Sequence, residues 1–114
     1  MIYVIDDDEV MAECIARNCG NDVRVYPDAI SAMAAISEGE MPSLIFLDIM
    51  LDGPDGFTFL NELVSYNDTA KIPVVIVSSI DFGEKDLLPY RVVGVLDKCS
   101  MKPKDVARFV RGYE

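Results

Sequence analysis

Five polar residues stand at the ends of four short apolar runs that lie far apart in the chain, and their types suit phosphate chemistry. They are Asp6, Asp7, Asp48, Ser78 and Lys98. A carboxylate can act as a nucleophile and form an aspartyl phosphate, while a hydroxyl group and an ammonium group can hold the oxygens of the transferred group. Oxygen ligands with no histidine or thiolate among them favour Mg²⁺, or the similar ion Mn²⁺. This chemistry requires a fold that brings the five residues together.

Four near-continuous apolar runs must position these residues, and they predict β-strands that are buried on both faces. They cover residues 2–5, 44–47, 74–77 and 92–96. Such runs are typical of a parallel sheet that is covered by helices. Residues 23–26, Val-Arg-Val-Tyr, alternate instead, which predicts an edge strand.

Helical patterns lie between the predicted strands. The first covers residues 9–19, with Asp8 as its N-cap and Gly20 as the C′ residue that follows it. Its predicted buried stripe is Val10, Met11, Cys14 and Ile15. Helices at 28–38 and 56–66 follow, with predicted buried residues Ala29, Met33 and Ile36 in one and Phe57, Leu60 and Val64 in the other.

The last two helical patterns differ in strength. Residues 84–88 predict only a weak helix, because Pro89 interrupts it. The final helix opens at Lys102-Pro103, where proline suits a first turn, and its predicted inward residues are Val106, Phe109 and Val110.

The alternation of strands and helices predicts an α/β fold. We expect a doubly wound five-stranded parallel sheet in the flavodoxin-like order 2-1-3-4-5, with helices on both faces. Ligands of such sheets bind at the carboxyl ends of the strands, where the order reverses. Strands one and three are neighbours in this order, so Asp6, Asp7 and Asp48 would form one cluster. The three carboxylates would repel one another unless a cation sits among them.

Size and charge limit the classes of function. A chain of 114 residues fits one domain, residues 1–114, and 51% hydrophobic residues are enough for its core. Ten basic and 20 acidic residues give a net charge of 10 − 20 = −10. Such a chain would be repelled by DNA, so we expect no direct binding of nucleic acid.

Composition also predicts the cellular setting. The three cysteines form no CxxC pair and leave an odd thiol, which suits a reducing compartment. No apolar stretch approaches 18 residues, and no basic segment precedes the first apolar run, so we expect a cytoplasmic protein without membrane spans. The chain has no histidine, so a phosphohistidine, if one takes part, belongs to a partner.

Four motifs together resemble the receiver domain of two-component response regulators, of the kind found in chemotaxis regulators. They are V-I-D-D-D at 4–8, L-D-I-M-L-D-G-P-D-G at 47–56, V-S-S at 77–79 and D-K at 97–98. The resemblance extends over nearly the whole chain. It implies a phosphoacceptor switch whose only reactions are its own phosphorylation and dephosphorylation, and which takes its phosphoryl group from a histidine kinase or a histidine phosphotransfer protein. A downstream protein or effector domain of unknown identity would read the result.

The resemblance also implies a role for each motif residue. Asp48 matches the phosphorylated aspartate, and Ser78 and Lys98 match the hydroxyl and the lysine that assist the transfer. Asp7 would bind Mg²⁺ directly together with Asp48. Two further contacts to the metal would be the Met50 backbone carbonyl and, through water, Asp6.

Three positions depart from the family pattern, and all of them bear on how a signal leaves the site. Val95 occupies the switch position that usually carries tyrosine or phenylalanine. Cys99 follows Lys98 where proline, often after a cis bond, is usual, and we expect a trans bond because a cis bond to another residue costs about 2.5–4 kcal/mol. Asp52 replaces a frequent proline four residues after Asp48 and adds negative charge.

Two other functions fit parts of the sequence. Residues 5–10 also fit the D-x-D signature of haloacid-dehalogenase-type phosphohydrolases, in which Asp6 would be the nucleophile, although the chain is short for that fold. A receiver-like docking module that is never phosphorylated is the second alternative, and Val95 and Cys99 would be compatible with it.

Overall fold

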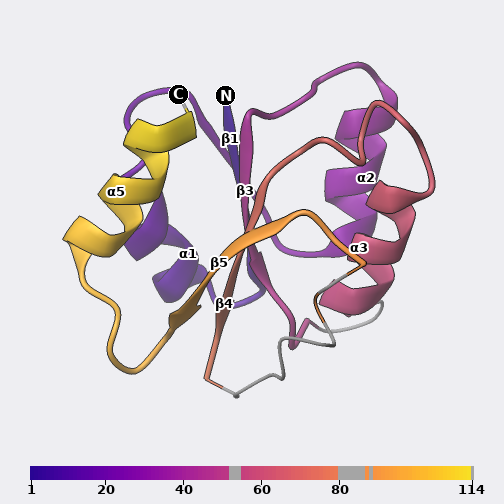
Figure 1. Ribbon diagram of the computed structural model, residues 1–114. Helices are drawn as coiled ribbons and strands as arrows, with labels where there is room; N and C mark the ends of the chain where they lie inside the picture. The colour runs from indigo at the N-terminus through magenta and orange to yellow at the C-terminus, as the bar shows by residue number, and fades with distance from the viewer. Residues whose placement is uncertain (52–54, 80–86, 88, 114) are drawn as a thin grey trace.

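The computed structural model describes residues 1–51, 55–79, 87 and 89–113 of the chain. Five parallel strands form one sheet in the order β2-β1-β3-β4-β5, which confirms the predicted order. The strands are β1 (Ile2–Ile5), β2 (Val23–Tyr26), β3 (Leu44–Asp48), β4 (Val74–Ser78) and β5 (Val92–Asp97). In the described part of the chain, two helices cover each face of the sheet (Figure 1): α1 (Glu9–Ala16) and α5 (Pro103–Tyr113) on one side, and α2 (Ala29–Ser37) and α3 (Gly56–Val64) on the other.

The interior strands explain the continuous apolar runs. Every residue of β1, β3 and β4 is buried, because each of these strands has a neighbour on both sides and helices above and below. The prediction that β5 is buried in the same way was wrong. β5 lies at the second edge of the sheet, and all its residues are half-buried or exposed.

The sheet separates two apolar layers. Alternate strand residues point to opposite faces, so Tyr3 and Ile5 pack with α2 and α3, while Ile2 and Val4 pack with α1 and α5. The same alternation runs along β3 and β4. The carboxyl ends of the interior strands are therefore held from both sides by packed side chains.

Aspartate side chains start three of the helices. Asp8 accepts hydrogen bonds from the backbone N–H groups of Val10 and Met11, at 3.0 and 3.3 Å, which confirms the predicted N-cap of α1. Asp28 caps α2 by accepting from the Ser31 N–H at 2.7 Å. The third helix begins in the same way at Asp55, which the sequence analysis did not assign.

The buried stripes of α1 and α3 were predicted correctly only in part: Ile15 and Leu60 are buried as expected, but other predicted members are not. Val10 is 73% exposed and Val64 is 37% exposed. The residues that α1 buries are Ala12 and Ile15, because small alanines allow a helix to approach a sheet closely, which a search for large apolar residues does not detect. In α3 the buried side chains likewise include Leu63 in place of Val64.

Helix ends and backbone conformation agree only in part with the predictions. α1 ends at Ala16, so Gly20, whose φ of 84° is positive, lies beyond the C-cap Arg17 and is not the C′ residue. No cis peptide bond occurs in the described part of the chain, which confirms that the Lys98–Cys99 bond is trans. The weak helix predicted at 84–88 lies, apart from Leu87, outside the described residues. None of the helices described is both long and apolar enough to cross a bilayer.

Candidate functional site

The candidate site lies at the carboxyl ends of β1, β3, β4 and β5. Ile5 pairs with Leu47, so Asp6 and Asp48, each the next residue in its strand direction, come to neighbouring positions. Ser78 pairs with Asp97 at the ends of β4 and β5. The sequence-predicted residues therefore converge on one edge of the sheet, and β1 and β3, where the strand order reverses, are its centre.

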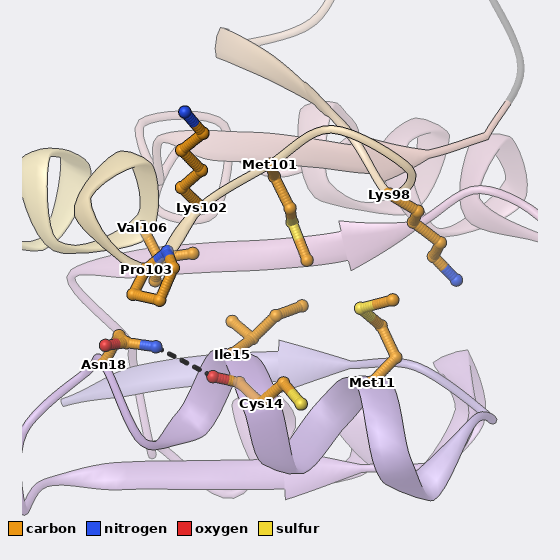
Figure 2. Close-up of a pocket in the computed structure, with 9 residues that line it drawn as sticks. All are labelled: Met11, Cys14, Ile15, Asn18, Lys98, Met101, Lys102, Pro103 and Val106. Carbon is orange, nitrogen blue, oxygen red and sulfur yellow. Dashed lines mark hydrogen bonds between the residues drawn. The ribbon is translucent and has the colours of Figure 1, made fainter.

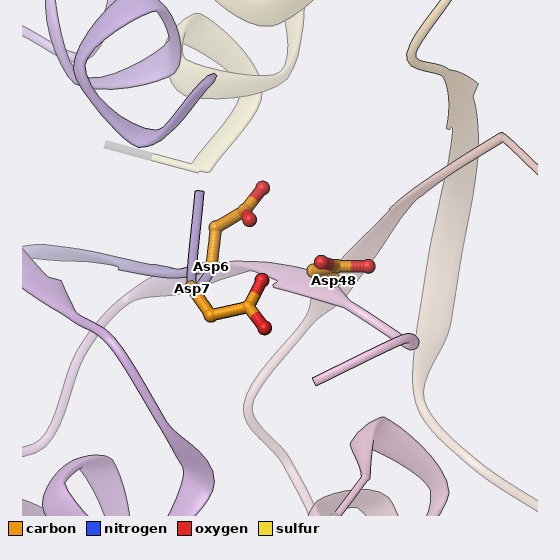
Figure 3. A group of neighbouring side chains, drawn as sticks. All are labelled: Asp6, Asp7 and Asp48. Carbon is orange, nitrogen blue, oxygen red and sulfur yellow. The ribbon is translucent and has the colours of Figure 1, made fainter. Parts of the chain in front are cut away.

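Three carboxylates form an acidic cluster at this edge (Figure 3). Asp6, Asp7 and Asp48 each offer one oxygen, and these oxygens lie within 4.8 Å of one another. Asp6 and Asp48 are each only 3% exposed, whereas Asp7 is exposed. The cluster thus has two buried members and one that faces solvent.

Backbone amides and a lysine hold the two buried carboxylates. Asp48 Oδ1 accepts a hydrogen bond from the Met50 N–H at 2.9 Å, and Asp6 Oδ1 accepts one from the Asp8 N–H at 2.9 Å. The Lys98 ammonium lies between their other oxygens, 3.1 Å from Asp48 Oδ2 and 3.2 Å from Asp6 Oδ2. Since Lys98 follows β5, its side chain reaches across the end of β4 to contact both acids.

The electrostatics of the site follow from burial and from this lysine. Burial raises the pKa of Asp6, and the Asp8 N–H and the Lys98 ammonium only partly offset that effect. Burial alone would lower the pKa of Lys98, but its contacts with Asp48 and Asp6 outweigh burial and raise it. Lys98 therefore stays protonated at neutral pH, and one cation faces three carboxylates.

The donor set fits a hard divalent cation. All three groups are carboxylates, and oxygen ligands are those that Mg²⁺ and Mn²⁺ prefer. Asp6 Oδ2 is buried and makes no hydrogen bond of good geometry, although it lies near the Lys98 ammonium. A divalent cation among the three carboxylates would reduce the repulsion within the cluster, which Lys98 alone only partly offsets.

The remaining predicted residues lie around the cluster. Ser78 is buried, and its carbonyl accepts a hydrogen bond from the Lys98 N–H at 3.0 Å, which joins the ends of β4 and β5. The Met50 side chain is exposed, while its backbone contacts Asp48. Val95 lies on β5, opposite Ile76, and is 48% exposed. The position of Asp52 lies outside the described residues.

Comparison with known proteins decides the family. The model of the response regulator receiver domain family matches residues 2–109. The chain belongs to this family. A curated relative, the response regulator PleD of Caulobacter vibrioides, is 29% identical over 112 residues, which are 96% of this chain but 24% of PleD. The chain thus spans about a quarter of the length of that relative.

Two solved receiver structures resemble the chain in fold and in sequence. The Mn²⁺-bound form of response regulator Rcp1 is 26% identical with a TM-score of 0.72, and the alignment covers 97% of this chain and 88% of Rcp1. The phosphorylated cyanobacterial phytochrome response regulator RcpA is also 26% identical, with a TM-score of 0.74 and the same coverage of both chains. The family match confirms the resemblance on which the sequence analysis relied.

Two residues near the site have structural roles that the sequence did not reveal. Asp55 caps α3 by accepting a hydrogen bond from the Thr58 N–H at 3.0 Å. Gly56 has no positive φ, so its role is not one of backbone conformation. A Cβ on Gly56 would lie 2.7 Å from the Ile49 Cα, and the Gly56 N–H donates to the Ile49 carbonyl. Gly56 is therefore needed for close approach, and it fixes the start of α3 against the residue that follows Asp48.

A hollow of about 260 Å³ adjoins the site, between α1 and the segment that leads into α5 (Figure 2). Met11 and Cys14 line it, together with Ile15, Met101 and the stem of Lys98. The prediction that Cys14 belongs to the buried stripe of α1 was wrong, because Cys14 is exposed at this hollow. Since Lys98 is a member of both, the hollow belongs to the surroundings of the receiver site.

Proposed function

We propose that this receiver domain accepts a phosphoryl group onto Asp48 from the phosphohistidine of a histidine kinase or a histidine phosphotransfer protein, with Mg²⁺ bound at the acidic cluster. One observation carries the proposal: the Lys98 ammonium lies 3.1 Å from Asp48 Oδ2 and 3.2 Å from Asp6 Oδ2, beside a cluster of three carboxylates. The phosphorylated state of the related RcpA supports it. We expect the domain to act in the cytoplasm and to signal to a downstream protein or effector domain.

The chain's own residues supply most of the proposed chemistry. An Asp48 oxygen forms a bond to phosphorus while the phosphorus–nitrogen bond of the partner breaks, and the imidazole leaves with the electron pair. The Met50 N–H and Lys98 hold the Asp48 carboxylate for this attack. After the transfer, the Lys98 ammonium and the Ser78 hydroxyl stabilise the negative oxygens of the phosphoryl group.

The metal assignment is part of the same proposal. Asp7, Asp48 and the Met50 backbone carbonyl would hold Mg²⁺, and Asp6 would act through water. When bound, Mg²⁺ neutralises charge on the carboxylates and on the oxygens of the transferred group. The exposure of Asp7 gives the ion access to the cluster from solvent. Mn²⁺ would serve similarly, and the Mn²⁺-bound form of Rcp1 supports this choice.

Intact-mass measurement tests the proposal directly. The protein is incubated with Mg²⁺ and acetyl phosphate or phosphoramidate, and we expect a gain of one labile phosphoryl group that Asp48→Asn abolishes. Beryllofluoride, which mimics a phosphoryl group on a carboxylate, should bind the wild type but not this variant. Asp55→Asn is a suitable control, because asparagine can also cap α3 and the residue lies outside the acidic cluster.

The alternatives give different results in the same experiment. A phosphohydrolase with Asp6 as nucleophile would turn over the phosphodonor in Asp48→Asn and lose that activity in Asp6→Asn. A docking module that is never phosphorylated would gain no mass even under conditions in which Mg²⁺ binds. Either result would contradict the assignment of Asp48 as phosphoacceptor.

A further inference from the structure

The outward surface of α2 lacks the charges that a solvated helix normally carries. Residues 29–37 read Ala-Ile-Ser-Ala-Met-Ala-Ala-Ile-Ser, with no charged residue. Ile30 is 65% exposed and Ala34 is also exposed. The exposed face of a helix in a soluble protein is usually charged or polar, and a contiguous apolar surface often marks an interaction site. This surface lies on the face of the sheet opposite α1 and α5 (Figure 1).

Two adjoining hollows extend this surface into a groove between α2 and α3. One, of about 230 Å³, is lined by Ile30, Met33 and Phe59 among others. The second, of about 470 Å³, is lined by Ile36 and Tyr66 among others. Met33 and Glu62 line both hollows, so the two are continuous, and we call them together the α2–α3 groove. None of its lining residues belongs to the phosphoacceptor site.

Charge limits what this groove can bind. Among the described residues that line it, the charged ones are Glu62 and Asp68, and both are acidic. Asp28 and Glu38 flank α2 at its two ends. A second copy of the chain would bring a net charge of −10 to this acidic rim, which disfavours self-association. The smaller hollow is mainly apolar, whereas the larger one is also lined by the polar residues Ser37 and Thr69. Together with the acidic rim, this groove complements a partner that has apolar anchors and basic flanks.

We propose that the α2–α3 groove binds an amphipathic basic helix of a partner protein. Helices bind grooves of this kind through apolar residues at positions i, i+3 or i+4, and i+7. Met33, at the middle of the groove, has a flexible thioether side chain that adapts to different anchors. The groove is distinct from the acidic cluster, so this binding does not depend on phosphorylation of Asp48.

Paired model peptides test the proposal. One is an amphipathic helix of leucine and lysine, and its twin has glutamate in place of every lysine; both carry a fluorophore for anisotropy measurements. We expect the full chain to bind only the lysine peptide, and Ile30→Glu to weaken binding about tenfold through loss of the apolar contact. Glutamate near the start of α2 favours the helix dipole, so the variant should fold, which circular dichroism checks.

Val10→Glu is the matched control. Val10 is 73% exposed on α1, outside the groove, and the substitution adds the same charge. An added negative charge alone would strengthen binding of a basic peptide, so weakening by Ile30→Glu and not by Val10→Glu would support the groove. Asp48→Asn should bind the peptide like the wild type, which separates this test from that of the phosphoacceptor.

Three outcomes would overturn the proposal. If Ile30→Glu and Val10→Glu change the binding of the lysine peptide equally, the binding comes from general attraction between opposite charges. If the glutamate peptide binds as tightly as the lysine peptide, the acidic rim does not determine the choice of partner. Sedimentation that reveals a dimer of the wild type, lost in Ile30→Glu, would show that a second copy occupies the groove.

Discussion

The carboxyl ends of β1 and β3 are much more deeply buried than that of β5, although all three strands contribute to one site. Asp6 follows β1 and Asp48 ends β3. Every residue of these two strands is buried, and both aspartates are 3% exposed. β5 has no wholly buried residue, and it contributes through Lys98, whose side chain reaches across β4. The acids are thus fixed by the interior of the sheet, whereas the cation approaches them from its edge.

This difference coincides only in part with where the sequence keeps to the receiver motifs and where it departs from them. Asp6, Asp48 and Ser78, at the ends of interior strands, fit the motifs on which the resemblance rests. Val95, on the exposed edge strand, and Cys99, just after it, depart from them, and so does Asp52, which comes after the interior strand β3 in the sequence. We therefore expect phosphorylation to resemble that of other receivers more closely than the step that follows it.

Removal of the lysine should have the largest effect on stability. Lys98→Met leaves the buried carboxylates of Asp6 and Asp48 without their shared cation, and we expect a loss of about 3 kcal/mol in the free energy of unfolding. Urea unfolding at neutral pH without Mg²⁺ measures it. Lys104→Met, which removes an exposed charge from α5, should change stability by less than about 0.5 kcal/mol. Equal effects of the two substitutions would mean that the cation contributes little.

A glycine on β5 tests whether the edge strand is nevertheless closely packed. A Cβ on Gly94 would overlap with Cζ of Phe109 on α5, so Gly94→Ala must displace the ring. We expect a loss of about 1–3 kcal/mol in urea unfolding, as for other overpacked sites. Adding Phe109→Leu to the Gly94→Ala variant should recover part of the lost stability.

Gly112→Ala is the control for this pair. No atom lies within 4 Å of a Cβ at Gly112, which is on the same helix as Phe109. We expect the stability to stay equal or to rise by up to about 0.5 kcal/mol, because alanine favours helix more than glycine does. A loss as large as that of Gly94→Ala would mean that glycine substitution itself, rather than the contact with Phe109, causes the effect.

The sequence predicted the interior of the molecule better than its edges. The five strands and their order were correct, because continuous apolar runs and regular alternation leave few other topologies. The prediction that β5 is buried was wrong. Its apolar residues match those of an interior strand, and only the sheet order places it at an edge. The acidic cluster followed from the strand order together with the family resemblance.

Close contacts between elements could not be predicted. Gly56 is required because Ile49 lies close to it, and Gly94 because Phe109 of α5 does. Neither contact is visible in the local sequence. Some members of the predicted stripes of α1 and α3 were misplaced for a related reason, because the helix rotation depends on how small residues such as Ala12 fit the sheet. Spacing along one helix does not contain that information.

Binding of Mg²⁺ should stabilise the site end of the interior strands. At a concentration ten times the dissociation constant, a ligand specific for the folded state adds about 1.4 kcal/mol, which raises the melting temperature by several degrees. Asp7→Asn should reduce this shift strongly. Asp8→Asn is the matched control, because asparagine keeps the cap of α1 while an adjacent charge is removed. No Mg²⁺-dependent shift at constant ionic strength would contradict the proposed metal site.

The smallest expected effect is on the pH dependence of stability, and it distinguishes a buried acid, Asp6, from a half-buried one, Asp28. Because the pKa of Asp6 is raised by burial, the folded state binds more protons than the unfolded state above the ordinary value of 3.8, and stability falls as pH rises through that window. The pKa of Asp28 is lowered by the Ser31 N–H, so its contribution is lost as pH falls. In EDTA, Asp6→Asn should therefore increase stability more at pH 7 than at pH 4, whereas Asp28→Asn should lower it more at pH 7. Melting temperatures across this range check both signs, and the same sign for both variants would mean that the Asp6 carboxylate is not desolvated by the interior strands.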